Sequence, residues 1–183
     1  MTRIETVDWC VKNRWVDDVV SDPRFPPSGY YKVFYLIMRE LKPDVAVELG
    51  TCGGGASLHM ALGNPNTEVF TFDIAREPSV VVAEEMASNF HFYREDSVLA
   101  SERFWNPEVE FLFIDTTHTY KQTMREYEAW LPKMDKKGII AMDDVGREGM
   151  WKAIAEIGGV QRHYVEIGGN DIPGVPGGMV FVF

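Results

Sequence analysis

Short apolar runs alternate with helix-like segments through most of the chain, and no other feature constrains the fold as strongly. The apolar runs are 44–49 (DVAVEL), 68–74 (EVFTFDI), 90–95 (FHFYRE), 108–115 (EVEFLFID) and 138–144 (GIIAMDD). Strands of this kind are typical of a parallel sheet that is buried on both faces. The segments between them, such as 55–63 and 119–134, are expected to be helices that cover the sheet.

The C-terminal part of the chain departs from this alternation. Two strand-like runs, 160–167 (VQRHYVEI) and 177–183 (GGMVFVF), are separated by 168–176 (GGNDIPGVP) with no helical pattern between them. Strands in direct succession favour a hairpin, in which they are antiparallel. We therefore predict an α/β fold: a Rossmann-like, doubly wound sheet of seven strands, mostly parallel, with an antiparallel C-terminal hairpin.

The beginning of the chain predicts two helices with a proline-rich loop between them. Apolar residues in 4–20 have a roughly helical spacing, and the prolines in 21–29 (SDPRFPPSG) stop any regular element. Ser28 can cap a second helix at 29–41, whose apolar residues surround enough of its circumference to predict burial on more than one side.

Length and composition bound the class of protein. The 183 residues suit a single domain, which we place at 1–183 with a helical leader and loop at 1–27 and a Rossmann-like core at 28–183. Cys10 and Cys52 are far apart and form no metal-type pair, which favours a reducing compartment. No apolar run is long enough to span a bilayer, and the start lacks the apolar block of a signal peptide. We expect a cytoplasmic protein without a membrane partner.

The net charge is strongly negative, at −10. Binding to a phosphate backbone requires clustered lysine and arginine, so this charge argues against a nucleic-acid partner.

A glycine-rich loop follows the first apolar run, in 45–58 (VAVELGTCGGGASL). Glycines allow a close approach of the backbone to a ligand, and ligands of open parallel sheets bind beyond the carboxyl ends of the strands. The loop is not the dinucleotide motif G-x-G-x-x-G, because Cys52 stands where that motif has its second glycine. Taken alone, the glycines would equally well mark a tight turn.

Acidic residues follow the next two runs. Asp73 ends the second run and can accept hydrogen bonds from ribose hydroxyls, while Asp96 and Ser97 follow the third and are placed for an adenine edge. The alternative is that acids occupy these positions only because each strand surfaces there. Together with the glycine loop, the three strand ends predict one nucleoside site.

This set of residues resembles the class I S-adenosylmethionine-dependent methyltransferases, over roughly residues 30–183. The resemblance rests on Glu48-x-Gly50, the glycines through Gly54, Asp73 and the pair Asp96-Ser97. It implies that Gly50 and the neighbouring backbone approach the methionine part of the cofactor. It also implies that Asp73 holds the ribose and that Asp96 and Ser97 contact adenine. The cofactor-binding residues predicted in full are Glu48, Gly50, Thr51, Gly54, Ser57, Asp73, Ile74, Asp96, Ser97 and Asp115.

Three further carboxylates follow the fourth and fifth runs. Asp115 ends the fourth, and Asp143 and Asp144 end the fifth. Adjacent parallel strands would bring them to one rim, where they would repel one another without a cation and would suit a hard divalent ion such as Mg²⁺. Individually, Asp115 would serve as a helix cap, and the pair as ordinary polar ends of a strand.

His118 lies three positions after Asp115, where a neutral imidazole can remove a hydroxyl proton. The arrangement resembles metal-dependent O-methyltransferases of the catechol type and the macrolide-sugar type. In these families an aspartate after the fourth strand and a pair after the fifth bind Mg²⁺, and a base follows three residues after the first aspartate. That base is histidine in the sugar type, so Asp115-x-x-His118 is more similar to it. Asp171 is the only candidate for the additional acid that grips a catechol.

The predicted function is O-methylation of a small molecule, which is sugar-like, polyketide-like or catechol-like, with S-adenosylmethionine as donor and Mg²⁺ at Asp115, Asp143 and Asp144. His118 and Asp115 are the predicted catalytic residues, and a homo-oligomer is compatible with this class. Two alternatives stay open: a metal-independent methyltransferase with His118 as base, and a non-catalytic module that binds S-adenosylmethionine. A nicotinamide dehydrogenase is disfavoured by the missing second glycine.

Overall fold

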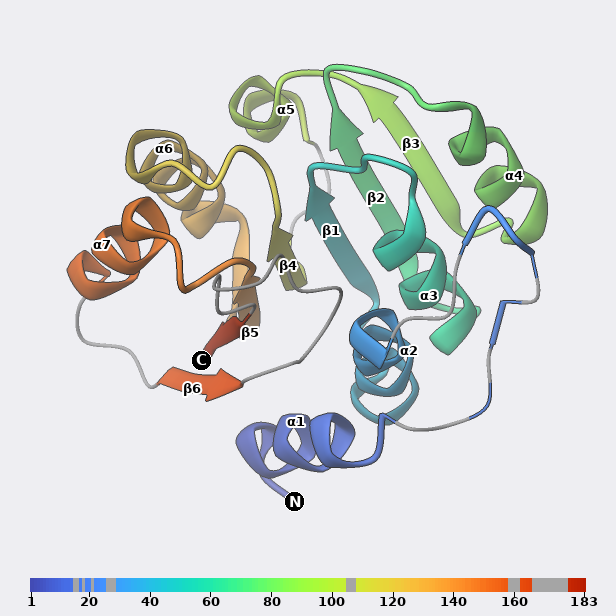
Figure 1. Ribbon diagram of the computed structural model, residues 1–183, viewed down its shortest axis with the longest axis horizontal. Coiled ribbons are helices and arrows are strands. Elements are labelled where there is room, and N and C mark those ends of the chain that lie inside the picture. The colour runs from blue at the N-terminus through green and yellow to red at the C-terminus, as the bar shows by residue number, and fades with distance from the viewer. Residues whose placement is uncertain are drawn as a thin grey trace.

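The computed structural model describes residues 1–14, 17, 19–20, 22–25, 29–104, 108–157, 162–165 and 178–183, with only the backbone described at 29–30 and 162–165. Within these ranges a single sheet carries helices on both faces (Figure 1). Its strand order is β3-β2-β1-β4-β5-β7-β6. The predicted Rossmann-like α/β architecture is confirmed.

The strands are β1 (Val45–Leu49), β2 (Glu68–Asp73), β3 (Phe90–Arg94), β4 (Val109–Ile114), β5 (Met134–Met142), β6 (Arg162–Val165) and β7 (Met179–Val182). The helices are α1 (Arg3–Lys12), α2 (Gly29–Leu41), α3 (Gly55–Gly63), α4 (Pro78–Met86), α5 (Ser97–Arg103), α6 (Tyr120–Trp130) and α7 (Glu148–Glu156), with a 3₁₀ turn at Leu131–Lys133.

The first five strands are parallel, and the last two are antiparallel. β4 pairs with both β1 and β5, and β2 joins β1 to β3. β7 pairs antiparallel with both β5 and β6, so the mostly parallel sheet with antiparallel C-terminal strands is confirmed. The loop predicted at 168–176, and Asp171 within it, lie outside the described residues.

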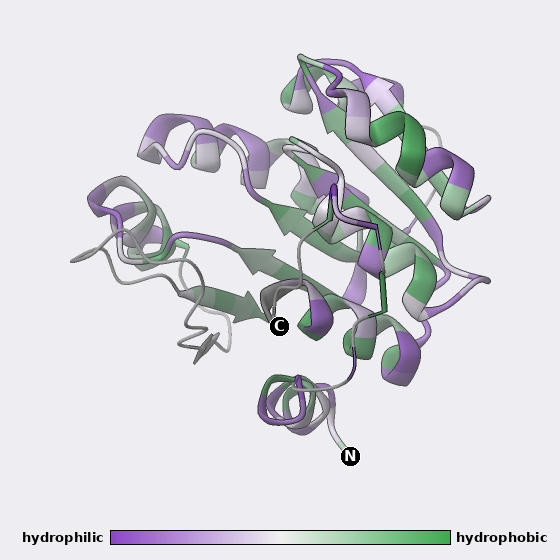
Figure 2. Ribbon diagram, turned by 45° about the vertical axis from the view of Figure 1, so that its right-hand side comes forward, coloured by the Kyte–Doolittle hydropathy of each residue, from purple (hydrophilic) through white to green (hydrophobic). Residues whose placement is uncertain are grey.

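Alternate residues of the strands point to opposite faces of the sheet and form two separate cores. On one face, β1 contributes Ala46 to a core with α2, α3 and α4; on the other, it contributes Val45 and Val47 to a core with α5, α6 and α7. Figure 2 shows the strands mostly green, with helices on both sides of the sheet that carry both purple and green segments. Both faces being covered explains why the strands have continuous apolar sequences.

The N-terminal helix is shorter than its apolar spacing predicts. α1 ends at Lys12, where the backbone and side-chain amides of Asn13 both bond to the carbonyl of Trp9. Asparagine favours such local side-chain bonds at helix ends, and these compete with continuation of the helix. The remaining apolar positions of the predicted 4–20 helix include Trp15 and Val16, which, like the Ser28 cap, lie outside the described residues.

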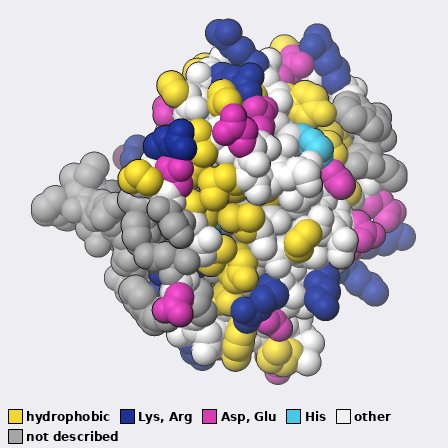
Figure 3. Space-filling view, turned by 90° about the vertical axis from the view of Figure 1, so that its right-hand side faces the viewer, with side chains coloured by type: hydrophobic (Ala, Val, Ile, Leu, Met, Phe, Trp, Pro, Cys, Tyr) yellow, Lys and Arg dark blue, Asp and Glu magenta, His cyan; other side chains and the backbone are white. Residues whose placement is uncertain are grey.

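The surface carries charges of both signs. Figure 3 views the side that lies at the right of Figure 1 and shows Lys/Arg and Asp/Glu side chains around a central group of hydrophobic ones. Among the described helices, each is too short or too polar to cross a membrane.

Candidate active site

The strand order places a switch point between β1 and β4. β1 lies between β2 and β4 in the sheet. The chain continues from β1 to β2 on one side and from β4 to β5 on the other, so the loops after β1 and β4 lead in opposite directions. Leu49 pairs in register with Ile114, which in turn pairs with Met142. The next residues, Gly50, Asp115 and Asp143, therefore lie side by side at the carboxyl edge of the sheet, where open α/β sheets bind their ligands.

Gly50 and Asp115 are the closest pair at this edge. The Asp115 N–H donates to the carbonyl of Leu49 over 2.9 Å, and a Cβ placed on Gly50 would lie 2.0 Å from the Asp115 carbonyl oxygen. Gly50 also has φ +96°, in the region that favours glycine. The glycine is required because two strand ends meet here.

A cavity of about 380 Å³ opens beyond these strand ends. Its volume is in the range of small-molecule sites. Of the predicted cofactor-binding residues, it is lined by Gly50, Asp73, Ile74, Asp96, Ser97 and Asp115. It is also lined by six residues that the sequence did not single out: Cys52, Phe72, Glu95, Thr116, Thr117 and Gln122. Five of these are sequence neighbours of predicted residues, whereas Gln122 reaches the cavity from α6.

Asp73 holds the glycine loop in place. Its Oδ2 accepts from the backbone N–H of Cys52 over 2.9 Å, and its Oδ1 accepts from the N–H of Ala75 over 3.0 Å. A carboxylate has about four acceptor positions, so both oxygens can also bind hydroxyl donors in the cavity.

Four predicted cofactor residues are not among those that line the described cavity. These are Glu48, Thr51, Gly54 and Ser57, all of them buried. The Glu48 carboxylate accepts from the Thr71 hydroxyl over 2.5 Å, and Thr71 in turn lies 2.6 Å from the hydroxyl of Thr51. Burial raises the pKa of the Glu48 carboxyl to about 8, against the opposing effect of hydrogen bonds from Thr71 and Ser57, with Asp115 and Asp73 adding to the rise.

The raised pKa of Glu48 predicts a pH-dependent stability. The unfolded chain loses the Glu48 proton near pH 4.5, whereas the folded chain keeps it up to about pH 8, so the unfolding free energy should fall between these values as pH rises. At about 1.4 kcal/mol per pKa unit, the unfolding free energy of the wild type should decline by roughly 2–5 kcal/mol over this pH range. We expect this decline to be absent from Glu48→Gln, because glutamine cannot ionise. Urea unfolding of both proteins from pH 5 to 8.5 measures this. Parallel pH profiles of the two proteins would contradict the raised pKa of Glu48.

Asp96 and Ser97 are both at the cavity wall, but part of their bonding capacity is already used. Asp96 Oδ1 caps α5 by accepting from the N–H groups of Val98 and Leu99. The Ser97 hydroxyl donates to Glu126 over 2.5 Å. The second Asp96 oxygen and the Ser97 N–H, which as the first of its helix has no partner within α5, are the groups suited to an adenine edge.

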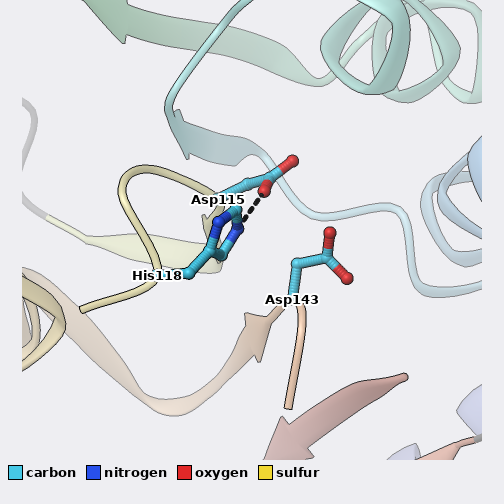
Figure 4. A group of neighbouring side chains, drawn as sticks. All are labelled: Asp115, His118 and Asp143. Atoms are coloured by element: carbon cyan, nitrogen blue, oxygen red, sulfur yellow. Dashed lines mark hydrogen bonds and ion pairs between the residues drawn. The ribbon is translucent and has the colours of Figure 1, made fainter. Parts of the chain in front are cut away.

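Asp115, His118 and Asp143 form a cluster at the rim (Figure 4). One ligand atom from each lies within 4.8 Å of the others, a spacing that could hold a metal ion. Asp144, the fourth predicted member, is turned aside: its Oδ2 is 2.6 Å from Arg147 Nε and 3.5 Å from His118 Nδ1. The structure therefore brings together three of the four residues, with His118 rather than Asp144 as the third.

His118 lies between carboxylates. Its Nε2 is 2.8 Å from Asp115 Oδ1, and its Nδ1 faces Asp144. Burial works to lower the pKa of His118, but the hydrogen bond to Asp115 and the charges of Asp115, Asp144 and Asp143 outweigh it and raise the pKa. Both His118 and Asp144 have positive φ, of 54° and 51°. Such backbone conformations are concentrated at functional sites.

A doubly wound sheet, a glycine loop at its switch point and acids after successive strands define the class I methyltransferase architecture. A family described as "Methyltransferase domain" matches residues 47–145, more than half of the chain. The chain belongs to this methyltransferase family, and so to an enzyme class. Comparison with curated protein sequences gave no match.

Solved structures with bound S-adenosylmethionine or S-adenosylhomocysteine have the same fold. TomG, an O-methyltransferase of Streptomyces achromogenes in complex with S-adenosylmethionine, has a TM-score of 0.70 at 14% identity, with 98% of this chain and 88% of TomG covered. The Bacillus cereus O-methyltransferase in complex with S-adenosylhomocysteine has a TM-score of 0.66 at 18% identity, covering 97% and 90%. Aeropyrum pernix fibrillarin, with bound S-adenosylmethionine, has a TM-score of 0.61 at 17% identity, covering 76% and 66%. At these identities the similarity concerns the fold.

Proposed function

We propose that this protein is an S-adenosylmethionine-dependent O-methyltransferase that acts on a small-molecule hydroxyl beside a second oxygen, with a divalent cation at Asp115 and Asp143. The observation that carries the proposal is the meeting of two features at one strand end. Asp115 both lines the cavity at the switch point and belongs to the metal-type cluster. A methyl donor and a metal-held acceptor would therefore meet at this residue.

The cavity residues suit S-adenosylmethionine along its whole length. Asp73 offers carboxylate oxygens to ribose hydroxyls, and Asp96 and Ser97 offer polar groups to the adenine edge. Gly50 leaves the backbone open to the methionine end. The solved O-methyltransferases with S-adenosylmethionine or S-adenosylhomocysteine share this fold, which supports the same ligand here.

The rim cluster suits a divalent cation. Asp115 and Asp143, completed by substrate oxygens and water, would suit a hard divalent cation such as Mg²⁺ or Mn²⁺ and would leave His118 free to act as a base. When bound, such an ion would lower the pKa of an acceptor hydroxyl and hold the acceptor in line with the methyl group. The two carboxylates would position the ion, and the cavity beside Asp115 would position the donor.

His118 is the residue that we propose to accept the acceptor's proton at Nε2 or Nδ1. In the arrangement seen here both ring nitrogens face carboxylates, which favours the protonated ring. Neutralising the charge of Asp115 and Asp143 with a cation would remove much of that effect and favour the neutral imidazole that acts as a base.

A metal-independent methyltransferase is the second candidate. The 2.8 Å contact between His118 Nε2 and Asp115 is an imidazole–carboxylate pair, in which a carboxylate can orient a general base without any ion. In that case Asp115 would act on His118 and not on a metal.

One set of measurements separates these proposals. We expect S-adenosylhomocysteine to bind in calorimetric titration, and S-adenosylmethionine to be converted when catechol, sugar and polyketide hydroxyls are supplied as acceptors. EDTA should abolish this turnover, and Mg²⁺ or Mn²⁺ should restore it. Turnover that withstands EDTA would favour the metal-independent candidate, and binding without turnover of any acceptor would favour a non-catalytic module.

His118→Asn is expected to lower turnover by a factor of about 10²–10⁴, the usual contribution of a positioned base. Affinity for S-adenosylhomocysteine should stay within about threefold, because His118 is not among the residues lining the described cavity. His91→Asn is the matched control, since His91 lies on β3 and pairs with Glu68 away from the rim. Full turnover in His118→Asn would rule out the base.

A further inference from the structure

Three residues of α6 contact Ser97, which lies at the wall of the cavity. Gln122 Nε2 donates to the Ser97 hydroxyl oxygen over 3.2 Å, and that hydroxyl donates to Glu126 Oε1 over 2.5 Å. Trp130 Nε1 donates to the Ser97 carbonyl over 2.8 Å. The three residues are spaced by four, so they form one stripe on the helix. α6 therefore holds both the side chain and the backbone of Ser97. We call Asp96 and Ser97, the residues proposed to contact adenine, the adenine wall.

Glu126 makes a further contact with the loop that follows β4. Its Oε2 accepts from the hydroxyl of Thr116 over 2.9 Å, and Thr116 directly follows Asp115. One carboxylate thus joins the start of α5 to the loop that follows β4. Both Ser97 and Thr116 line the cavity, whereas Glu126 itself does not.

Glu126 is completely buried, with 0% of its surface exposed. Its Oε1 also accepts from Gln122 Nε2 over 2.9 Å, so three donors converge on it. Burying a carboxylate is costly unless it is hydrogen-bonded, and an apolar residue would be the ordinary choice on the buried side of a helix. The three contacts compensate that cost and specify the relative position of two segments that are far apart in sequence.

From these contacts we infer that Glu126 is a positioning residue that keeps the adenine wall and the Asp115 loop in one fixed geometry. The inference rests on the proposed function, because it assigns Ser97 to the cofactor site and the Asp115 loop to the metal site. The consequence is that loss of Glu126 weakens the binding of both the cofactor and the metal ion, although Glu126 contacts neither of them. Packing of α6 alone would affect only the stability of the fold.

Glu126→Leu and Glu126→Gln form the test. Leucine removes every acceptor, so the Ser97, Thr116 and Gln122 donors are left unpaired, and we expect affinities for S-adenosylhomocysteine and for Mn²⁺ each to fall at least about tenfold. Glutamine keeps an oxygen toward Ser97 and Gln122, while the Thr116 hydroxyl can rotate to accept from the amide. Both affinities should then return to within about twofold of the wild type. Calorimetry measures the first ligand, and electron paramagnetic resonance of Mn²⁺ measures the second.

Asn89→Leu is the matched control. Asn89 is also a buried polar residue with three hydrogen bonds, to the carbonyls of Ala61, Asn64 and Thr67, but it lies before β3, at the opposite edge of the sheet. Asn89→Leu should lower the thermal midpoint of unfolding as Glu126→Leu does, and leave the affinities for S-adenosylhomocysteine and Mn²⁺ unchanged. Equal losses of affinity in the two variants, or unchanged affinities in a folded Glu126→Leu, would overturn the inference.

A second variant serves if Glu126→Leu does not fold. Ser97→Ala removes one of the three donors, and Ser97 contributes no atom to the rim cluster. We expect its Mn²⁺ affinity, measured without the cofactor product, to fall about threefold; an unchanged value would contradict the coupling. If the wild type binds neither S-adenosylhomocysteine nor Mn²⁺, the proposed function fails. Wild-type binding with unaltered variants refutes only the role of Glu126.

Discussion

Asp115→Ala is expected to reduce methyl transfer by a factor on the order of 10³ or more. Asp115 is the residue shared by the cavity and the rim cluster, so its loss removes the proposed metal ligand and the partner of His118 together. Metal contacts to a reacting oxygen are worth several kcal/mol, and each 1.4 kcal/mol corresponds to about a tenfold change in rate. Single-turnover assays at saturating Mg²⁺ measure the effect on the chemical step.

The metal and the base can be separated in the same experiment. Asp143→Ala removes a ligand but leaves the Asp115–His118 pair, so the metal-dependent mechanism predicts nearly as large a loss for it, whereas the metal-independent mechanism predicts little change. Asp135→Ala is the control, because Asp135 lies at the opposite end of β5 and caps a local turn at Lys137. If Asp115→Ala retained wild-type turnover, Asp115 would have no role in either mechanism.

Gly50→Ala is expected to destabilise the fold by roughly 3–5 kcal/mol and to abolish cofactor binding. The added Cβ would lie 2.0 Å from the carbonyl oxygen of Asp115 and 2.7 Å from its carbonyl carbon, both of them backbone atoms, at φ +96°. Neither of these backbone atoms can move away without separating the ends of β1 and β4, and the cavity begins at these strand ends. Urea unfolding and calorimetric titration with S-adenosylhomocysteine measure the two effects.

Gly53→Ala is its matched control within the same loop. A Cβ at Gly53 would first meet the Ser79 hydroxyl at 3.1 Å, a side-chain atom that can rotate away. We expect less than about 1 kcal/mol of destabilisation and retained binding. If both alanine variants behaved alike, the loop would tolerate side chains generally, and the close approach at Gly50 would not be essential.

Parallel-sheet geometry explains why part of the site was predictable. Asp115 and Asp143 each follow directly after a buried strand, and adjacent parallel strands end at the same edge, so local sequence placed them together. Asp73 and Ser97 were predictable for the same reason. The direction of the Asp144 side chain was not predictable, because it depends on a backbone turn at φ 51° that directs the carboxylate to Arg147.

The sequence did not predict the contacts made by the buried polar residues. Glu48 is predicted as a cofactor contact beside the glycine loop, yet its buried carboxyl is bonded to Thr71 and does not line the described cavity. Glu126 and Gln122 appear in the sequence as ordinary polar residues of an amphipathic helix. Their spacing of four places them on one stripe, but nothing local indicates that this stripe meets Ser97.

The sequence by itself determined the alternation of strands and helices, the glycine loop at the end of β1 and the acids at the strand ends. These depend on apolar periodicity and on which residues can follow a buried strand, both of which are local properties. Only the tertiary structure decided that β1 and β4 lie side by side and that His118 rather than Asp144 completes the cluster. It alone showed that one buried carboxylate, Glu126, joins two segments that line the cavity, the start of α5 and the loop after β4. Such contacts connect segments distant in the chain, and their partners are set by strand order and helix packing, which no local pattern specifies.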